Sequence, residues 1–273
     1  MEKETQHFIS LIIPVYKQEK TIVADVRHIK QVLDKIRYGY EIIIVVDGIL
    51  DKSFQNMQKA KLQHVRVVGL KKNHGKAFAV RTGMHRAKGD YVIFIDAGME
   101  IDPNGISMLL EHMEWYDADI IVGSKRHPAS IIRYSPLRKV LSYGYYWFVR
   151  ALFGIKVKDT QAGIKIFRKK VLIDILPLLV EKKFAGDLEM LVAAYQQKHR
   201  RIYEAPIKLD YSFAQFTSAA TFDSIRAILQ DTLAIWYRAY IVGQYRKIKK
   251  KAQREVVQKL PKSNYAKSSK IIR

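Results

Sequence analysis

Residues 91–103 read YVIFIDAGMEIDP, an apolar run that ends on Asp96 and leads into a proline. Five apolar residues before an acid predict a buried β-strand with a carboxylate at its C-terminal end. Glu100 follows four residues later. Across a turn both carboxylates can reach one Mg²⁺ or Mn²⁺, because these ions take oxygen ligands and share them with substrate phosphates. The alternative is that Glu100 is simply exposed and Asp102 caps the next helix.

Similar strands occur along the first half of the chain. They are short, rich in Ile and Val, and apolar on both faces, which is typical of parallel strands covered by helices. Helical patterns near 19–37, 51–61, 76–87 and 103–117 alternate with them, which predicts an α/β fold with a doubly wound sheet. The additional strands are FISLIIPV (8–15), YEIIIVV (40–46), VRVVGL (65–70) and DIIVG (119–123).

Polar and turn-forming residues follow several of these strands. Ligands of doubly wound sheets bind beyond the C-terminal ends of the strands, where Asp47 and Asp96 are expected. Asp47 can accept hydrogen bonds from a base or ribose, or it can cap the following helix. Gly75 and Lys76 open a predicted helix, where backbone N–H groups and a lysine suit a diphosphate. The alternative for Lys76 is a solvated side chain on an ordinary helix.

A basic and aromatic region spans 125–155. Arg126, Arg133 and Arg138 can bind phosphate through their guanidinium forks, or they can form a basic surface. The stretch LSYGYYWFVRALFG (141–154) suits a membrane interface, or it packs against the sheet as a buried helix.

Composition limits the remaining classes. The 273 residues are 48% hydrophobic and include no cysteine, which supports a sizeable core and excludes disulfides and thiolate catalysis. The net charge is +22. The N-terminus does not resemble a signal peptide, and no apolar run is long enough to predict a transmembrane helix.

The C-terminal part is expected to form separate units. Helical apolar spacing predicts an amphipathic, membrane-surface helix over 223–251, with Ile235, Trp236 and Ile241 on its apolar face. A basic tail over 252–273 follows, and residues 1–222 form the main domain. Residues 244–273 hold eleven Lys/Arg and one acid, a net charge of +10 that is typical of contact with nucleic acid or an anionic membrane, although a solvated, disordered tail is the alternative.

Several motifs in this order resemble family-2 glycosyltransferases, above all the polyprenyl-phosphate branch with its dolichyl-phosphate mannosyl- and glucosyltransferases. The resemblance covers roughly residues 8–240. It implies a GT-A, Rossmann-like fold, a nucleotide-diphosphate sugar (UDP- or GDP-hexose) as donor, a divalent metal, and inverting transfer to a polyprenyl phosphate. The motifs are LIIPVYKQE, IIIVVDGILDKS, HGKAFAVRTGMHRAKGDYVIFIDAG, VGSKRHP, KDTQAGIKIFRKKV, FAGDLEML and RIYEAPIKLDY.

The resemblance also implies roles for individual residues. The metal is expected on Asp96 and Glu100. Asp96, Arg126, Arg138, Gln161 and Asp187 are the expected catalytic residues. The expected nucleotide-sugar residues are Pro14, Tyr16, Glu19, Asp47, Lys76, Asp96 and Ala97, and the expected acceptor-side residues are Arg126, Arg138, Asp159, Thr160 and Gln161.

The chain departs from the family pattern at several motif positions. The second acid of the D-x-D motif is Gly98 here, and Glu100 stands where the mannosyltransferase branch has Gln. Lys17 and Gln18 replace the family's Asn-Glu pair, and Gly186 replaces an aromatic residue. The displaced acid at Glu100 therefore becomes the predicted second metal ligand.

Asp187 opens a predicted helix beside Glu189. A phosphate monoester is already largely ionised near neutral pH, so its attack needs no strong base. Asp187 is then a positioning residue, a base for a different acceptor, or an exposed acid at a helix start.

Three other functions compete with transfer to a lipid phosphate: transfer to a glycan or protein, sugar-nucleotide binding without catalysis, and nucleic-acid binding. The last is disfavoured, because the sequence contains no recognisable nucleic-acid-reading module. The predicted location is the cytoplasmic face of a membrane, as a peripheral protein.

Overall fold

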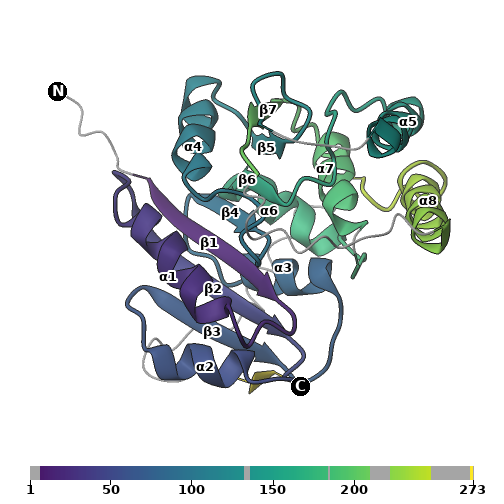
Figure 1. Ribbon diagram of the computed structural model, residues 1–273. Coiled ribbons are helices and arrows are strands. Elements are labelled where there is room, and N and C mark those ends of the chain that lie inside the picture. The colour runs from purple at the N-terminus through teal and green to yellow at the C-terminus, as the bar shows by residue number, and fades with distance from the viewer. Residues whose placement is uncertain (1–6, 132–135, 184, 210–221, 247–270, 273) are drawn as a thin grey trace.

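The fold is built around one sheet with helices on both faces (Figure 1). The computed structural model describes residues 7–131, 136–183, 185–209, 222–246 and 271–272, with the backbone alone at 136–139, 222–224 and 271–272. The strand order is β7-β5-β6-β4-β1-β2-β3-β8. The strands are β1 (Phe8–Val15), β2 (Gly39–Asp47), β3 (Val65–Leu70), β4 (Tyr91–Ile95), β5 (Ile120–Ser124), β6 (Ile164–Arg168), β7 (Ile202–Pro206) and β8 (Ile271–Ile272).

The helices follow the predicted alternation with the strands. Each of the helical patterns expected in the first half is confirmed, with boundaries shifted by a few residues. They are α1 (Ile22–Leu33), α2 (Ser53–Ala60), α3 (Lys76–Met84), α4 (Gly105–Trp115), α5 (Pro136–Phe153), α6 (Lys169–Ile175), α7 (Gly186–Gln196) and α8 (Phe222–Trp236), with a 3-10 turn η1 (Leu176–Leu178) and a π-helical turn η2 (Tyr237–Val242).

The sheet is not purely parallel. β1, β2, β3 and β4 pair in parallel, as predicted, but β6 runs antiparallel to both β4 and β5. β6 was not predicted from the sequence, because Lys165 interrupts its short apolar run. The antiparallel strand brings the segment before it, residues 159–163, to the same sheet edge as the end of β4.

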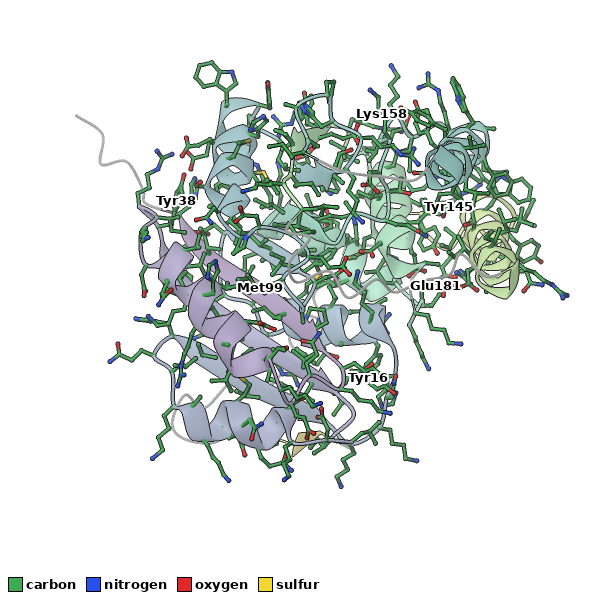
Figure 2. The ribbon with its side chains drawn as sticks, viewed as in Figure 1. Tyr16, Tyr38, Met99, Tyr145, Lys158 and Glu181 are labelled. Carbon is green, nitrogen blue, oxygen red and sulfur yellow. The ribbon has the colours of Figure 1, made fainter. Side chains whose placement is uncertain are left out.

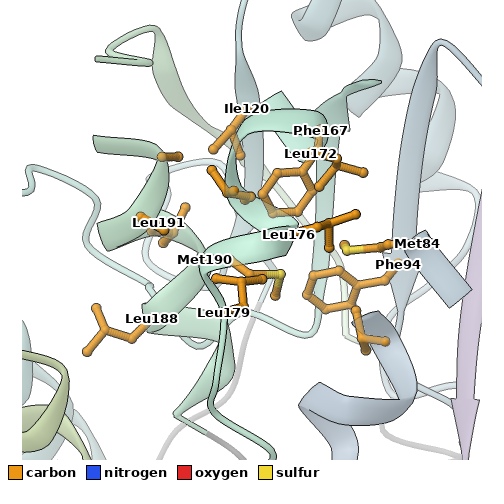
Figure 3. Close-up of a cluster of buried hydrophobic side chains, with 14 of the residues drawn as sticks. Met84, Phe94, Ile120, Phe167, Leu172, Leu176, Leu179, Leu188, Met190 and Leu191 are labelled. Carbon is orange, nitrogen blue, oxygen red and sulfur yellow. The ribbon is translucent and has the colours of Figure 1, made fainter. Parts of the chain in front are cut away.

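Two hydrophobic cores lie on the two faces of the sheet. Alternating strand residues point to opposite faces, so Ile12 joins one core while Leu11 and Ile13 join the other. Figure 3 shows part of the first core, where Phe94 of β4 and Phe167 of β6 meet side chains of α6 and α7. Both faces are therefore dry, as the continuous Ile and Val runs predicted.

The C-terminal helical segment packs into the first core. Ile235 and Tyr245 are fully buried there, and Trp236 is partly buried. The expectation that Ile235 faces a membrane is therefore wrong, although Ile241 is exposed. The helical run also ends at η2, because Gly243 adopts a left-handed conformation with φ of 70°.

Buried polar contacts anchor this segment to α7. The hydroxyl of Tyr245 donates to Glu189 at 2.6 Å, and Arg238 forms an ion pair with Glu181. Glu189 also accepts from the backbone N–H groups of Val180 and Glu181. Burial raises the pKa of Glu189 despite these donors. The C-terminal segment is thus tied to the helix that carries Asp187.

We expect Tyr245→Phe to lower the free energy of unfolding by about 1–3 kcal/mol, because a buried carboxylate loses one of its donors. Urea unfolding measures this change. Tyr237→Phe is the matched control, since Tyr237 lies on the same segment and is 54% exposed. Equal stability of the two variants would contradict the anchoring role.

Candidate active site

The predicted site residues gather where β1, β2 and β4 end. Pro14 is buried in β1, Tyr16 follows it with a half-exposed ring, and Asp47 ends β2 (Figure 2 labels Tyr16). Asp96 follows β4 directly. The convergence of these residues at one sheet edge is confirmed.

Asp47 positions the start of α3. One carboxylate oxygen accepts from the backbone N–H of His74 and the other from that of Gly75, each at 2.7 Å. Both alternatives raised from the sequence missed this partner, because it lies 28 residues further along the chain. The contact fixes the residue that follows Gly75, which is Lys76.

Lys76 joins two carboxylates from different parts of the fold. Its Nζ lies 2.7 Å from Oδ1 and 2.9 Å from Oδ2 of Asp96, and 3.1 Å from Oδ2 of Asp187. Its side chain is 19% exposed. Lys76 is therefore not a solvated side chain; it is a bound cation at the strand edge.

Lys165 completes a row of alternating charges. Its fully buried Nζ donates to the carbonyl of Ala162 at 2.7 Å and to Oδ1 of Asp187 at 3.3 Å. We call this set the charge row; its order is Asp96, Lys76, Asp187, Lys165. The ring of Phe94 lies under both ammonium groups, 5.6 Å from Lys76 and 5.2 Å from Lys165.

The opposite charges in this row shift the pKa values of its buried side chains. Burial opposes the charge of Asp187, but Lys165 and Lys76 outweigh it and lower the pKa of Asp187. Burial also opposes the charge of Lys76, but Asp187 and Asp96 raise its pKa. For Lys165 burial wins, and its pKa is lowered. Asp187 is thus an ionised, buried carboxylate, which corrects the alternative of an exposed acid at a helix start.

Lys165 was not predicted as a site residue. The sequence contained one signal: a lysine flanked by isoleucines within IKIF, inside a buried strand. Lysine is almost never fully buried without a partner. Such a residue predicts a carboxylate nearby, although the sequence alone does not say which one.

The segment before β6 fits closely around Asp96. The backbone N–H of Asp96 donates to the carbonyl of Gly163 at 2.8 Å. A Cβ atom on Gly163 would lie 2.4 Å from Oδ2 of Asp96, so a larger residue here would displace the Asp96 carboxylate. The DTQAG motif and the acid of β4 are therefore neighbours in space.

The acceptor-side residues are held by contacts within the protein. Asp159 accepts from the backbone N–H of Lys125 at 2.9 Å, and Thr160 is buried. Gln161 donates to the hydroxyl of Tyr145 at 3.5 Å. These residues line the connection between β5, α5 and β6.

Arg126 points its guanidinium at α5. It donates to Ser142 and to the carbonyl of Lys158, and it lies against the rings of Tyr143 and Tyr146. Arg138 belongs to α5, but its side chain lies outside the described residues, as does all of Arg133. Phosphate binding by Arg126 and Arg138 stays a prediction.

The turn after β4 has an unusual backbone. Gly98 has a φ of +97° and Met99 a φ of +60°, and Met99 is buried while Glu100 is exposed (Figure 2 labels Met99). An aspartate at Gly98 would be strained in this conformation. Asp102 accepts from the backbone N–H of Asn104 at 3.0 Å, which forms a turn just before α4; the N-cap of α4 is Asn104, and it makes no side-chain capping bond.

Glu19 and Ala97 complete the predicted set. Glu19 accepts from the backbone N–H of Lys52 at 2.9 Å and is exposed, while Ala97 is half-buried beside Asp96. Within the part of the chain that the structure describes, no group of three or more His, Cys, Asp or Glu side chains could hold a metal on its own. Metal ligation by Asp96 and Glu100 stays a prediction.

Comparison with known proteins identifies the family. The model of glycosyl transferase family 2 matches residues 10–176. The chain belongs to this family. The match begins in β1 and extends into η1, so it includes Asp47, Lys76, Asp96 and Lys165.

Curated relatives cover most of the chain. It is 29% identical to a dolichyl-phosphate β-glucosyltransferase of Saccharomyces cerevisiae, over 91% of this chain and 80% of the relative. It is 27% identical to the enzyme of that name from Dictyostelium discoideum, over 86% of this chain and 76% of the relative. A dodecaprenyl-phosphate galacturonate synthase of Rhizobium johnstonii is 23% identical over 68% of this chain and 53% of the relative.

Solved glycosyltransferases share the fold. Glucosyl-3-phosphoglycerate synthase of Mycobacterium tuberculosis, solved with Mn²⁺, UDP-glucose and phosphoglyceric acid, aligns with a TM-score of 0.61 at 14% identity, over 85% of this chain and 79% of that one. Mannosyl-3-phosphoglycerate synthase of Rubrobacter xylanophilus aligns with a TM-score of 0.68 at 12% identity, over 85% and 74%. The predicted GT-A, α/β fold is confirmed, and the chain is a transferase.

We expect Asp187→Asn to lower the free energy of unfolding by about 3–5 kcal/mol near neutral pH, because Lys165 loses its buried counter-charge. The pKa of Asp187 is lowered from its ordinary value of 3.8, so its ionic stabilisation is present above that pH and is lost as the pH falls through the folded-state pKa. The difference between parent and variant should therefore narrow in acid.

Urea unfolding at several pH values measures both effects. The control is Asp117→Asn, which removes an acid that is 64% exposed in its ion pairs with Arg168 and Arg201 and should cost about 1 kcal/mol or less. A cost for Asp187→Asn no larger than that of the control would show that the charge row does not support the fold.

Proposed function

We propose that this protein transfers a hexose from a nucleotide-diphosphate sugar to a polyprenyl phosphate, with inversion at the anomeric carbon. The observation that carries the proposal is Lys76, bound to Asp96 and Asp187 at the sheet edge where this fold takes nucleotides. Relatives named dolichyl-phosphate β-glucosyltransferases support glucose and a long isoprenoid phosphate. The structural neighbours solved with UDP support UDP-glucose as the first donor to test.

The donor would lie across the ends of β1, β2 and β4. Pro14, Tyr16 and Ala97 would shape the nucleotide pocket, and Asp47 would hold the loop before α3 in place. Lys76 would meet the diphosphate, since its ammonium is already fixed at this edge. A cation here stabilises negative charge on the leaving diphosphate more than charge on the bound sugar nucleotide, which lowers the barrier.

The residues at the C-terminal ends of the strands are suited to bind a divalent metal whose other ligands come from the substrate. Oδ1 of Asp96 is buried without a hydrogen bond among the described residues, and its ionic contact with Lys76 shows that a cation is accommodated there. Asp96 and Glu100 would hold Mg²⁺ or Mn²⁺ together with diphosphate oxygens, which suits ions that need few protein ligands. When bound, the metal would neutralise charge on the diphosphate.

Asp187 would not act as the general base. It is ionised, buried and already bound to two lysines, so it has no free side from which to take a proton. Its role is to hold Lys76. An acceptor that is already ionised, such as a phosphate monoester, fits this arrangement better than a hydroxyl does.

A membrane-bound acceptor requires a surface that meets the bilayer. Exposed apolar and aromatic side chains gather on α5 and on the α8–η2 segment, which lie side by side (Figure 1) and are joined by a hydrogen bond between Tyr145 and Thr232. We call this the α5–α8 face. Its members are Val140, Leu141, Tyr143, Trp147, Leu229, Leu233, Tyr237, Ile241 and Val242.

The α5–α8 face supports peripheral attachment to a membrane. Aromatic rings and aliphatic side chains on a helix surface suit the headgroup region, and the basic tail would add attraction to anionic lipid on the cytoplasmic leaflet. Among the described helices, none is long and apolar enough to span a bilayer. The acceptor-side residue Gln161 contacts Tyr145 of α5, so this face adjoins the proposed acceptor side.

We expect radiolabelled glucose to pass from UDP-glucose to a polyprenyl phosphate and to appear in the organic phase. Asp96→Asn should lower this rate by about 100-fold or more, because the metal that would neutralise the leaving diphosphate loses a charged ligand. GDP-mannose is the donor control. Label that is transferred only to glycan or protein would contradict the lipid acceptor.

In the same assay, a chelator should abolish transfer and Mg²⁺ or Mn²⁺ should restore it. Glu100→Ala should raise the metal concentration needed for half-maximal rate, whereas Glu100→Gln keeps an oxygen ligand and should have a smaller effect. An unchanged metal requirement in Glu100→Ala would remove Glu100 from the site.

Trp147→Ser combined with Ile241→Ser should weaken sedimentation with anionic vesicles, and most clearly at high salt, where only apolar contacts persist. The parent should keep part of its binding at high salt. Trp115→Ser is the control, because Trp115 is 85% exposed on α4, far from this face in Figure 1. Equal binding by all three proteins would reject the α5–α8 face as the membrane contact.

A further inference from the structure

Lys76 contacts Asp96 in the way a bound metal ion would. Its Nζ lies within 2.9 Å of both carboxylate oxygens, and Lys76 belongs to the first turn of α3, which Asp47 holds in place. Lys76 donates a hydrogen bond to Oδ2 of Asp96, whereas Oδ1 makes no hydrogen bond among the described residues and is in ionic contact with Nζ at 2.7 Å. An ionic contact of this kind can be replaced by another cation.

The two carboxylates bound to Lys76 differ in access and in partners. The side chain of Asp96 is 40% exposed, whereas that of Asp187 is 6% exposed. A cation from solvent can therefore approach the Asp96 side chain but not that of Asp187, and Oδ1 of Asp96, which is buried beside Lys76, becomes available when Lys76 moves. Among the described residues, Asp96 forms an ion pair with Lys76 alone, whereas Asp187 pairs with both Lys76 and Lys165.

This asymmetry allows Lys76 to leave Asp96 at little cost to the fold. If Lys76 moves away, Asp187 keeps Lys165 as its counter-ion, and Asp96 lies where solvent or a metal can balance its charge. If Lys76 stays on Asp187 alone, its ammonium keeps hydrogen-bond donors that are free for a new acceptor. A diphosphate at the strand edge supplies such an acceptor.

We infer that Lys76 is an exchangeable counter-ion of Asp96: a divalent cation displaces it, and the released ammonium, still held by Asp187, turns to the diphosphate of the donor. The inference rests on the proposed nucleotide-sugar function. Its consequence is that Lys76 blocks the metal until the donor arrives with its own phosphate charges. The metal should therefore bind the protein–nucleotide complex more tightly than it binds the free protein. The nucleotide should likewise bind the protein–metal complex more tightly than it binds the free protein.

The test measures Mn²⁺ binding without nucleotide, from the electron paramagnetic resonance signal of free Mn²⁺. Lys76→Met should bind Mn²⁺ about tenfold or more tightly than the parent, since a unit charge a few ångströms from the ion is removed. Lys72→Met removes the same charge from an exposed position four residues earlier and should change the affinity by about twofold or less. Adding Asp96→Asn to Lys76→Met should abolish the gain.

Three results would overturn the inference. They are an unchanged Mn²⁺ affinity in Lys76→Met, an equal gain in Lys72→Met, and a gain that survives Asp96→Asn. A crystal structure of the parent with Mn²⁺ and UDP gives a second test that needs no variant. Lys76 should contact Asp187 but not Asp96, and a Lys76 that still contacts both oxygens of Asp96, or a site without Mn²⁺, contradicts the exchange.

The outcomes also separate this inference from the proposed function. Transfer to polyprenyl phosphate that proceeds equally well in chelator, with no Mn²⁺ bound, would leave the function standing and reject the exchange. Exchange at Asp96 without transfer to a lipid phosphate would keep the role of Lys76 and reject the acceptor.

Discussion

The buried carboxylate of Asp187 is the constraint around which the site is built. An ion in a dry interior is costly unless opposite charges and hydrogen bonds surround it. Here Lys165 comes from β6 and Lys76 from α3, so one carboxylate of α7 ties three elements together. The same contacts extend to Asp96 after β4, which brings the charge row to the edge of the sheet.

Two further contacts link the elements around Asp187 to other parts of the fold. Asp47 holds the loop before α3 through two backbone N–H groups, so the end of β2 controls where Lys76 stands. On α7, Glu189 lies two residues beyond Asp187 and anchors Tyr245 of the C-terminal segment. One helix turn of α7 therefore carries both the carboxylate of the charge row and the buried anchor of the C-terminal segment.

The sequence was sufficient for much of the fold and for the location of the site. Apolar runs ending on Asp47 and Asp96 predicted the strands and the edge where they meet, because parallel strands end on the same side. Lys165 and β6 escaped prediction because a charged residue broke the apolar pattern of a short strand, and its partner lies 22 residues away.

The partners of Asp47 and Lys76 were hidden for the same reason. Helix-capping rules relate neighbours in sequence, whereas these contacts span 28 and 111 residues. The exposed face of the C-terminal segment was predicted only in part: its apolar spacing predicted a helix with Ile235 and Ile241 on a membrane-facing side, but packing turns Ile235 into the core and leaves Ile241 of η2 exposed.

If the charge row receives a diphosphate, calorimetry should detect it as a difference between the binding of UDP and of UMP. With Mg²⁺ present, we expect UDP to bind much more tightly than UMP, and Lys76→Met to lose most of this difference while its affinity for UMP stays close to that of the parent. Equal affinities of the parent for UDP and UMP, or an undiminished difference in Lys76→Met, would contradict it.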